Sequence, residues 1–263
     1  MKLRILASGS SGNCALLQTE QARVLIDVGY SARRIRALLS EAGATLESID
    51  AVFITHDHGD HTLGISGLAK LPHLKVFANA GTMRAVQASL TFQPMWQIFE
   101  TGARFRFRDL DVDTFSVPHD AHDPVGFRFS TGFDNDLFQP RKSLAWLTDL
   151  GHVPQHVRER LSDCDSLVVE SNHCPALLKA CVTRPWSTKQ RISGRHGHLS
   201  NESVRELLAG FTNPRWRHVF LTHLSRDCNS LDAVETMLST LRGRLSCEFR
   251  VVSPGGGTPT YEW

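Results

Sequence analysis

The sequence predicts an α/β fold in which two β-sheets pack face to face with helices on their outer surfaces. Three observations point to it. Short apolar, β-branched segments bounded by Gly, Asp, Asn or Pro recur along all 263 residues, as strands do. Between several of them lie segments with apolar residues at helical spacing. The second half of the chain repeats the pattern of the first, an order that fits two sheets covered by helices.

The predicted elements follow one another without a Pro- or Gly-rich linker, so we expect a single domain over residues 1–263. Ser31 and Ser200 are placed to cap helices. Residues 132–139 predict a long hairpin turn, and residues 255–257 a loose tail. Strands are expected at 3–7, 15–18, 23–28, 51–55, 75–78, 105–107, 112–117, 125–129, 143–148, 166–170, 218–222 and 248–252. Helices are expected at 31–42, 61–71, 81–90, 153–161, 200–208 and 231–241.

The composition is that of an ordinary globular protein, with 41% apolar and 21% charged residues. No apolar run approaches the roughly 18 to 20 residues of a membrane span, so no membrane partner is expected. The N-terminal segment is too short and too soon interrupted by glycine for a signal peptide. None of the six cysteines forms a Cys-x-x-Cys pair, and we expect free thiols in the cytoplasm. The net charge of +2 neither favours nor excludes a nucleic-acid partner.

A dense run of metal-ligand residue types follows the apolar strand at 51–54. In an extended chain, residues two apart face the same way, so His56 and His58 are able to point at one ion. Gly59 permits a sharp turn, after which Asp60 and His61 begin the next helix and face a second ion. Imidazole and carboxylate together suit zinc, manganese or iron. The alternative is a polar surface loop, but His-x-His-x-Asp-His is rare by chance.

Further ligands must come from other strand ends, because a metal site needs residues that converge from rigid elements. His119, Asp149 and His223 each follow an apolar run at its C-terminal end. A single histidine after a strand is more often a solvated loop residue. Three residues with the same placement reinforce one another as ligand candidates.

The order of these residues resembles the metallo-β-lactamase superfamily, whose motifs are an early Asp, His-x-His-x-Asp-His, a His, an Asp and a final His. Asp27 supplies the first of them here. The resemblance implies the αβ/βα four-layer sandwich with two divalent ions, Zn²⁺ or Mn²⁺, at one edge. It also implies that Asp149 bridges both ions, because a carboxylate has two oxygens to share. His56, His58 and His119 would hold one ion, and Asp60, His61 and His223 the other.

Four segments are similar to the YycJ/WalJ branch of that superfamily: 8–14, 170–173, 197–201 and 222–229. Members of this branch are regarded as DNA exonucleases. Cys174 departs from the pattern, since an Asp is expected there, and no function is assigned to that position. The resemblance therefore implies cleavage of phosphodiester bonds in nucleic acid, with DNA as the expected substrate.

The predicted catalytic residues are Asp60, at the metals, and His198, as donor to a phosphate or a leaving oxygen. Two ions would activate a shared water, so no serine or cysteine nucleophile is needed. Asp27 is predicted to accept a proton from a ligating imidazole and fix its tautomer. A turn residue at a strand end is an equal alternative for Asp27. Asp57 is open to the same interpretation.

Two segments are predicted to contact the substrate. The glycine-rich loop at 8–13 brings backbone N–H groups close to an anion, although it also fits a simple hairpin turn. Residues 171–201 contain five basic residues and Trp186 but no acidic residue, as a polyanionic, stackable substrate would require. An ordinary solvated helix and loop is an equal alternative for this segment. The predicted contacts are Ser10, Ser11, Asn13, His196, Ser200 and Asn201.

Two other functions remain open on the sequence. One is a small-molecule hydrolase acting on a thioester, lactone or cyclic phosphodiester, which the basic segment argues against. The other is a metal-binding or redox module without hydrolytic activity. All seven ligand positions are filled, which argues against an inactive site. Metal identity, cleavage polarity, strand preference and oligomeric state do not follow from the sequence.

Overall fold

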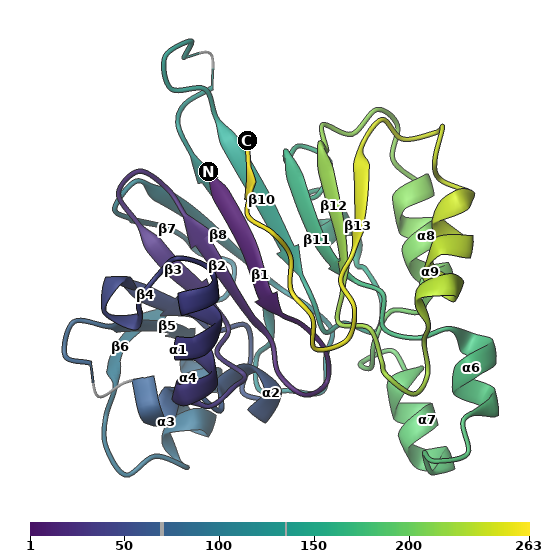
Figure 1. The fold of residues 1–263 in the computed structure, drawn as a ribbon, viewed down its shortest axis with the longest axis horizontal. Helices are drawn as coiled ribbons and strands as arrows, with labels where there is room; N and C mark the ends of the chain where they lie inside the picture. Colours follow the sequence, from purple (N-terminus) through teal and green to yellow (C-terminus); the bar gives the residue numbers. More distant parts are fainter. Residues whose placement is uncertain (69–70, 135) are drawn as a thin grey trace.

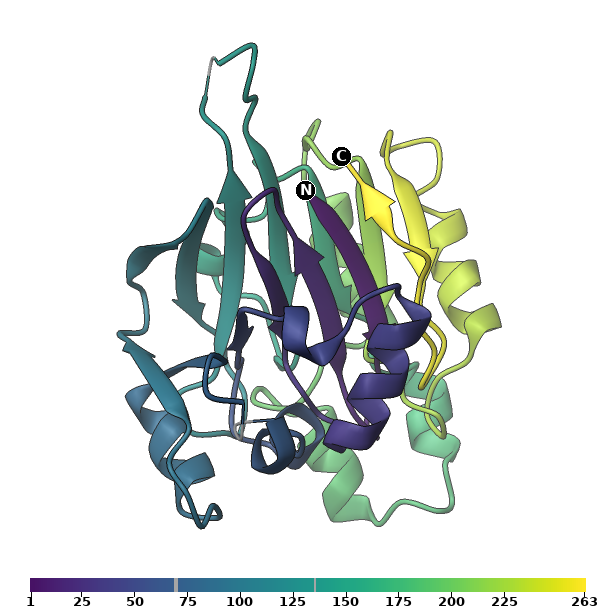
Figure 2. The same cartoon turned by 60° about the vertical axis from the view of Figure 1, so that its left-hand side comes forward.

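The computed structural model describes residues 1–68, 71–134 and 136–263. Two sheets pack face to face and helices lie on their outer sides, as Figures 1 and 2 show. This is the predicted sandwich. Parts of the helix expected at 61–71 and of the turn expected at 132–139 fall outside the described residues.

The first sheet has the strand order β14-β1-β2-β3-β4-β5-β6. Its β3, β4, β5 and β6 run parallel to one another, while β1 and β2 pair antiparallel. Parallel strands end at the same edge, so residues that follow β3 and β4 meet there. The strands are β1 (Lys2–Ala7), β2 (Cys14–Gln18), β3 (Arg23–Ile26), β4 (Ala51–Phe53), β5 (Lys75–Asn79), β6 (Met95–Phe99) and β14 (Tyr261–Glu262).

The second sheet has the order β13-β12-β11-β10-β9-β8-β7. Here β10, β11, β12 and β13 are parallel, and the remaining pairs are antiparallel. The C-terminal ends of β10, β11 and β12 therefore share an edge as well. The strands are β7 (Arg104–Phe107), β8 (Leu110–Ser116), β9 (Val125–Thr131), β10 (Lys142–Leu147), β11 (Ser166–Glu170), β12 (His218–Thr222) and β13 (Glu248–Val251).

Apolar helix faces cover the outer side of each sheet. On the first sheet lie α1 (Ala32–Glu41), α3 (Ile65–Leu68) and α4 (Ala80–Gln87). On the second lie α5 (Gln155–Arg158), α8 (Asn201–Ala209) and α9 (Leu231–Ser239). Ser31 and Ser200 cap α1 and α8 as predicted, each accepting a backbone N–H bond. The short elements η1 (Leu46–Ser48), α2 (Gly59–Thr62), α6 (Pro175–Ala180) and α7 (Trp186–Ile192) complete the described structure.

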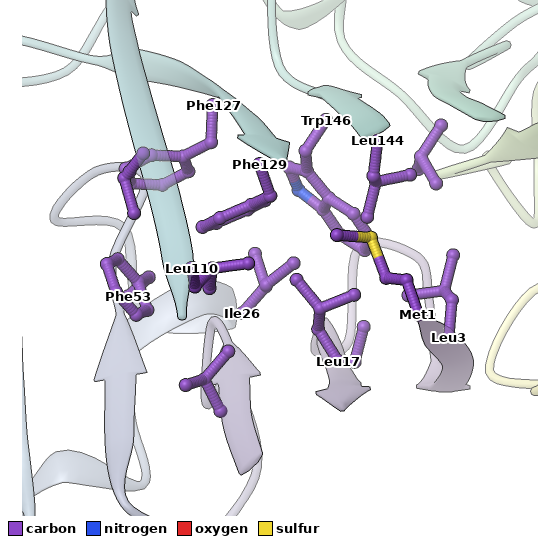
Figure 3. Packing of buried hydrophobic residues seen from close by; sticks show 14 of the residues in the cluster. Met1, Leu3, Leu17, Ile26, Phe53, Leu110, Phe127, Phe129, Leu144 and Trp146 are labelled. Carbon is purple, nitrogen blue, oxygen red and sulfur yellow. The ribbon is translucent and has the colours of Figure 1, made fainter. Parts of the chain in front are cut away.

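Phenylalanines dominate the core between the two sheets, part of which Figure 3 shows. Phe53 of β4 stacks on Phe77 with ring centroids 4.6 Å apart. Its edges meet Phe127 and Phe129 of the facing sheet, with centroids 5.9 and 5.4 Å away. Because β4 leads directly into His56, this packing also fixes the start of the metal run.

Replacing Phe53 by alanine should lower the free energy of unfolding by about 3–5 kcal/mol, since it removes a buried ring and leaves a cavity. Urea denaturation of both proteins would measure the loss. The matched control is Phe138→Ala, because that ring is 96% exposed and its removal should change stability by no more than about 0.5 kcal/mol. Equal stability of the two variants would contradict the assignment of Phe53 to the core.

The structure adds five elements to the predicted ones, η1, β6, α6, α7 and β14, and corrects two expectations. Where one helix was expected at 61–71, the described residues form two short helices, α2 and α3, because the chain turns between them. The edge strand β6 is half exposed and lacks a clear alternating pattern. The helices α6 and α7 are short and each begins beside a proline, so their periodicity is weak. The expected loose tail at 255–257 is wrong: Gly255 and Gly256 hydrogen-bond the backbone of Ser8, and β14 then pairs with β1. Within the described ranges, no helix is long and apolar enough to cross a membrane.

Candidate metal centre

The site lies where the parallel strands of both sheets end. Asp27 follows β3 and His56 follows β4 in the first sheet. In the second sheet, Asp149 follows β10, Glu170 ends β11 and His223 follows β12. The carboxyl ends of parallel strands are the usual location of ligand sites in α/β sheets. The register of the two sheets thus gathers residues separated by up to two hundred positions.

Three of these strand-end residues have a left-handed backbone. The φ angles are 56° at Asp27, 59° at Asp149 and 55° at His223. Residues other than glycine rarely adopt this conformation, and where they do it is often at functional sites. A left-handed residue turns the chain sharply after the strand, and all three side chains are buried here.

Ligand-type atoms form four overlapping groups at this edge in the described structure, and two of these groups contain the six predicted ligands other than Asp149. In the first, nitrogens of His56, His58 and His119 all lie within 4.8 Å of one another. In the second, atoms of Asp60, His61 and His223 satisfy the same limit. Asp60 Oδ2 is 3.6 Å from the Nε2 atoms of both His61 and His223.

The Asp149 carboxylate lies between the two groups. Its Oδ2 is 3.3 Å from His61 Nε2, and its Oδ1 is 3.5 Å from His223 Nε2. The same Oδ1 is 3.9 Å from His119 Nε2, in the other group. The structure therefore brings all seven predicted ligands together, with oxygens of Asp149 within 4 Å of nitrogens from both groups.

Several buried polar atoms at this centre have no hydrogen-bond partner within the described structure: His56 Nε2, Asp149 Oδ2 and His223 Nε2. Unpaired buried polar atoms are costly, so their convergence needs an explanation. Divalent cations bound at these atoms would satisfy all three, and a set of imidazole nitrogens and carboxylate oxygens suits zinc or manganese. The residues present fit a metal centre.

The charges of the site favour a cation. Burial raises the pKa of the Asp149 carboxyl, but His223 and His61 outweigh it and hold that pKa well below its usual value. Burial lowers the pKa of His56 far below its usual range, which keeps this ring neutral with a lone pair to offer. For His223, burial is outweighed by Asp149 and other carboxylates, and the pKa rises to about 10. Ionised carboxylates thus surround the imidazoles.

Asp27 holds the ring of His61 in place. The Asp27 side chain is fully buried, and its Oδ2 lies 2.8 Å from His61 Nδ1. Its Oδ1 accepts hydrogen bonds from the backbone N–H and the hydroxyl of Thr55. With its proton on Nδ1, His61 directs Nε2 toward Asp149 and Asp60. Of the two interpretations left open by the sequence, this geometry favours the partner of a ligating imidazole.

Asp27→Asn should lower the affinity for the metal by roughly 10- to 100-fold, because the amide no longer fixes the His61 tautomer. Competition with a fluorescent chelator would measure the affinity. Asp165→Asn is the control, since Asp165 is also buried but bonds Ser143 at the opposite end of β10. Unaltered metal affinity in Asp27→Asn would show that Asp27 is only a turn residue.

His198 lies beside the metal groups and is held by Glu170. Its Nδ1 is 3.0 Å from Glu170 Oε2 and 3.6 Å from Asp149 Oδ1. Glu170 is fully buried, and its Oε1 accepts backbone N–H bonds from Leu150 and Leu199. Burial raises the pKa of Glu170, but His198 outweighs it and the pKa falls to about 2.

Glu170 has no individual role in the sequence prediction, although it carries the same signal as the predicted ligands. It ends the apolar run at 166–169, as Asp149 and His223 follow theirs. An ionised carboxylate opposite His198 Nδ1 keeps a proton on that nitrogen and leaves Nε2 for a substrate. Thr55 was also missed, and its hydroxyl lies between Asp27, His56 and His61.

The predicted substrate contacts divide into two kinds. Asn13 and Asn201 are buried, at 4% and 2% exposure, and their amides bond other protein groups. Asn13 Nδ2 also lies 3.1 Å from His61 Nε2. Ser10, Ser11 and His196 are exposed, and Ser11 Oγ accepts from Arg226. Ser200 is half-buried and lines a cavity next to His198.

A family model described as the beta-lactamase superfamily domain matches residues 22–224. The chain belongs to the metallo-β-lactamase superfamily. The matched residues include the whole candidate centre, from Asp27 to His223. The resemblance predicted from the sequence is confirmed.

Two relatives of this superfamily cover nearly the whole chain. The exodeoxyribonuclease WalJ of Streptococcus pneumoniae serotype 2 is 34% identical over 99% of this chain and 97% of its own. The exodeoxyribonuclease YycJ of Bacillus anthracis is 32% identical over 89% of this chain and 86% of its own. Among solved structures, the Zn²⁺-bound PqqB of Methylobacterium extorquens has a TM-score of 0.72 and 16% identity, with 100% of both chains covered. That likeness shows the shared metallo-β-lactamase fold.

Proposed function

We propose that the protein is a metal-dependent nuclease that hydrolyses phosphodiester bonds in DNA from a strand end. The observation that carries the proposal is the Asp149 carboxylate between two groups of ligand atoms. The exodeoxyribonuclease names of relatives that align over nearly the full chain support the substrate class. We also propose that residues 1–263 work as one metallo-β-lactamase-like domain, since both sheets contribute ligands.

The seven residues would hold two divalent ions, Zn²⁺ or Mn²⁺. His56, His58 and His119 would hold one ion, Asp60, His61 and His223 the other, and Asp149 both. Such a pair of ions lowers the pKa of a water and stabilises charge on the oxygens of an in-line displacement. Oxygens of the Asp60 and Asp149 carboxylates lie 3.3–3.6 Å from the Nε2 atoms of His61 and His223, a spacing at which they would bind the same ion.

With protons on both ring nitrogens, His198 would give the Nε2 proton to the leaving oxygen and keep the Nδ1 proton that faces Glu170. Glu170 fixes the ring through Nδ1, so the opposite nitrogen faces away from Glu170 and is available for a proton transfer. The ring also stacks on His223, with centroids 5.3 Å apart, which places the proposed donor directly beside the proposed ligands.

The test is a comparison of substrates with purified protein and added Mn²⁺ or Zn²⁺. End-labelled single- and double-stranded DNA, RNA of the same sequence, and bis(p-nitrophenyl) phosphate would each be supplied. We expect DNA to be shortened progressively from an end, and Asp60→Ala to remove the activity. Rapid hydrolysis of the small ester without degradation of any nucleic acid would overturn the proposal in favour of a small-molecule hydrolase.

A further inference from the structure

A cavity of about 390 Å³ opens beside His198, on the side of the centre that α6, α7 and α8 cover. Figure 1 shows α6 and α7 as a separate pair of helices below α8 and α9. The volume is near the lower end of the roughly 300–1,000 Å³ range of small-ligand pockets. It suits one nucleotide, and a duplex would not enter. The lining residues include His173, Lys179, Trp186, Lys189 and His198.

The walls of this cavity combine an aromatic surface with positive charge. Trp186 is 68% exposed, although large aromatic side chains are usually well buried. Lys179 and Lys189 add two ammonium groups, and no acidic residue of the described chain lines the cavity. Lys189 Nζ donates to the Lys179 carbonyl at 2.8 Å, which ties α7 to α6. Such walls suit a planar ring attached to a phosphate.

His173 adds an unpaired polar group to the cavity wall. Only 3% of the residue is exposed, and its buried Nδ1 has no hydrogen-bond partner in the described structure. Burial lowers the pKa of this imidazole to about 4, so the ring is neutral near pH 7.

The cavity and the metal centre share one residue. His198 lines the cavity and is 3.6 Å from Asp149 through its Nδ1. A second link comes from α7, where Arg191 Nε donates to the carboxylate of Asp120, the neighbour of His119. A group bound in the cavity is therefore held next to the position where the bond is cleaved.

We propose that this cavity binds the terminal base of the strand, which stacks on Trp186 while Lys179 and Lys189 face the phosphates. The inference rests on the proposed nuclease function and deepens it. Residues of α6, α7 and α8 line the cavity, and its volume holds one nucleotide, so the strand would end there and lose one nucleotide at each step. The base is recognised by its flat face and not by its sequence, because stacking on an aromatic ring tolerates every base.

The test uses labelled single-stranded DNA with either a normal or an abasic residue at one end, in separate substrates for each end. The wild-type protein should remove the abasic residue about 10-fold more slowly at the end that it attacks, because stacking is lost. Trp186→Ala should slow removal of the normal residue to a similar extent and abolish the discrimination. Trp186→Phe should restore most of it.

Hydrolysis of bis(p-nitrophenyl) phosphate reports the metal centre in every variant and should fall much less than removal of the terminal nucleotide. Phe138→Ala is the matched control, an exposed aromatic outside the cavity lining, and should behave as wild type on both substrates. Two results would overturn the base site while the nuclease function stands. In one, the wild-type protein degrades DNA but removes the normal and the abasic residue at equal rates. In the other, Trp186→Ala degrades DNA as fast as the wild type. Hydrolysis of the small ester alone would overturn both.

Discussion

Asp149→Asn should abolish nuclease activity, with a loss of about 1,000-fold or more. The carboxylate lies between both groups of ligand atoms, and the amide has only one oxygen and no charge to offer. Transition-state stabilisation by bound ions amounts to several kcal/mol, and each 1.36 kcal/mol changes the rate about tenfold. Metal analysis by mass spectrometry should show that at least one ion is lost together with the activity.

Asp165→Asn is again the matched control for this change. Both aspartates are nearly fully buried. Asp149 follows the C-terminal end of β10, whereas Asp165 accepts hydrogen bonds from Ser143 near the N-terminal end of β10. That control should lose stability and keep its metal. If Asp149→Asn kept both ions and the wild-type rate, Asp149 would not be a shared ligand.

His198→Ala should lower the rate of DNA cleavage by roughly 100- to 10,000-fold, the contribution of a general acid, without loss of metal. The effect should depend on the leaving group. A p-nitrophenolate ion leaves without protonation, so hydrolysis of bis(p-nitrophenyl) phosphate should fall far less. The ratio of the two rates in variant and wild type is the measurement.

The control for this prediction is His218→Ala. His218 begins β12 and belongs to none of the ligand groups, so its replacement should leave the rates on DNA and on bis(p-nitrophenyl) phosphate unchanged. Glu170→Gln should reproduce part of the His198→Ala effect, because it removes the carboxylate opposite Nδ1. An equal loss on the two substrates in His198→Ala would mean that the ring only shapes the site and transfers no proton.

The sequence predicted the ligands because strand ends carry their own signal. An apolar run followed by His or Asp marks a residue at a sheet edge, and His119, Asp149 and His223 each follow this rule. The run from His56 to His61 is local, so its two ligand groups follow from the geometry of one strand and one turn. All seven predicted ligands come together in the structure.

The roles of Glu170 and Thr55 depended on contacts between distant segments. Glu170 ends β11 and meets His198 and Leu199, which lie about thirty residues later in the segment before α8. Asn13 and Asn201 show the reverse case. Both were predicted substrate contacts from their place in polar motifs, yet the fold buries their amides against other protein groups.

The sequence by itself determined the fold class, the strand-end residues of the centre and the basic, acid-free segment. These follow from local periodicity, spacing and charge, which need no knowledge of contacts. Two features are seen only in the tertiary structure: residues of α6, α7 and α8 line a cavity beside His198, and the C-terminal strand β14 pairs with β1. Such features arise when segments far apart in the chain pack together. The packing energy depends on which segments are in contact, and a local sequence pattern does not contain that information.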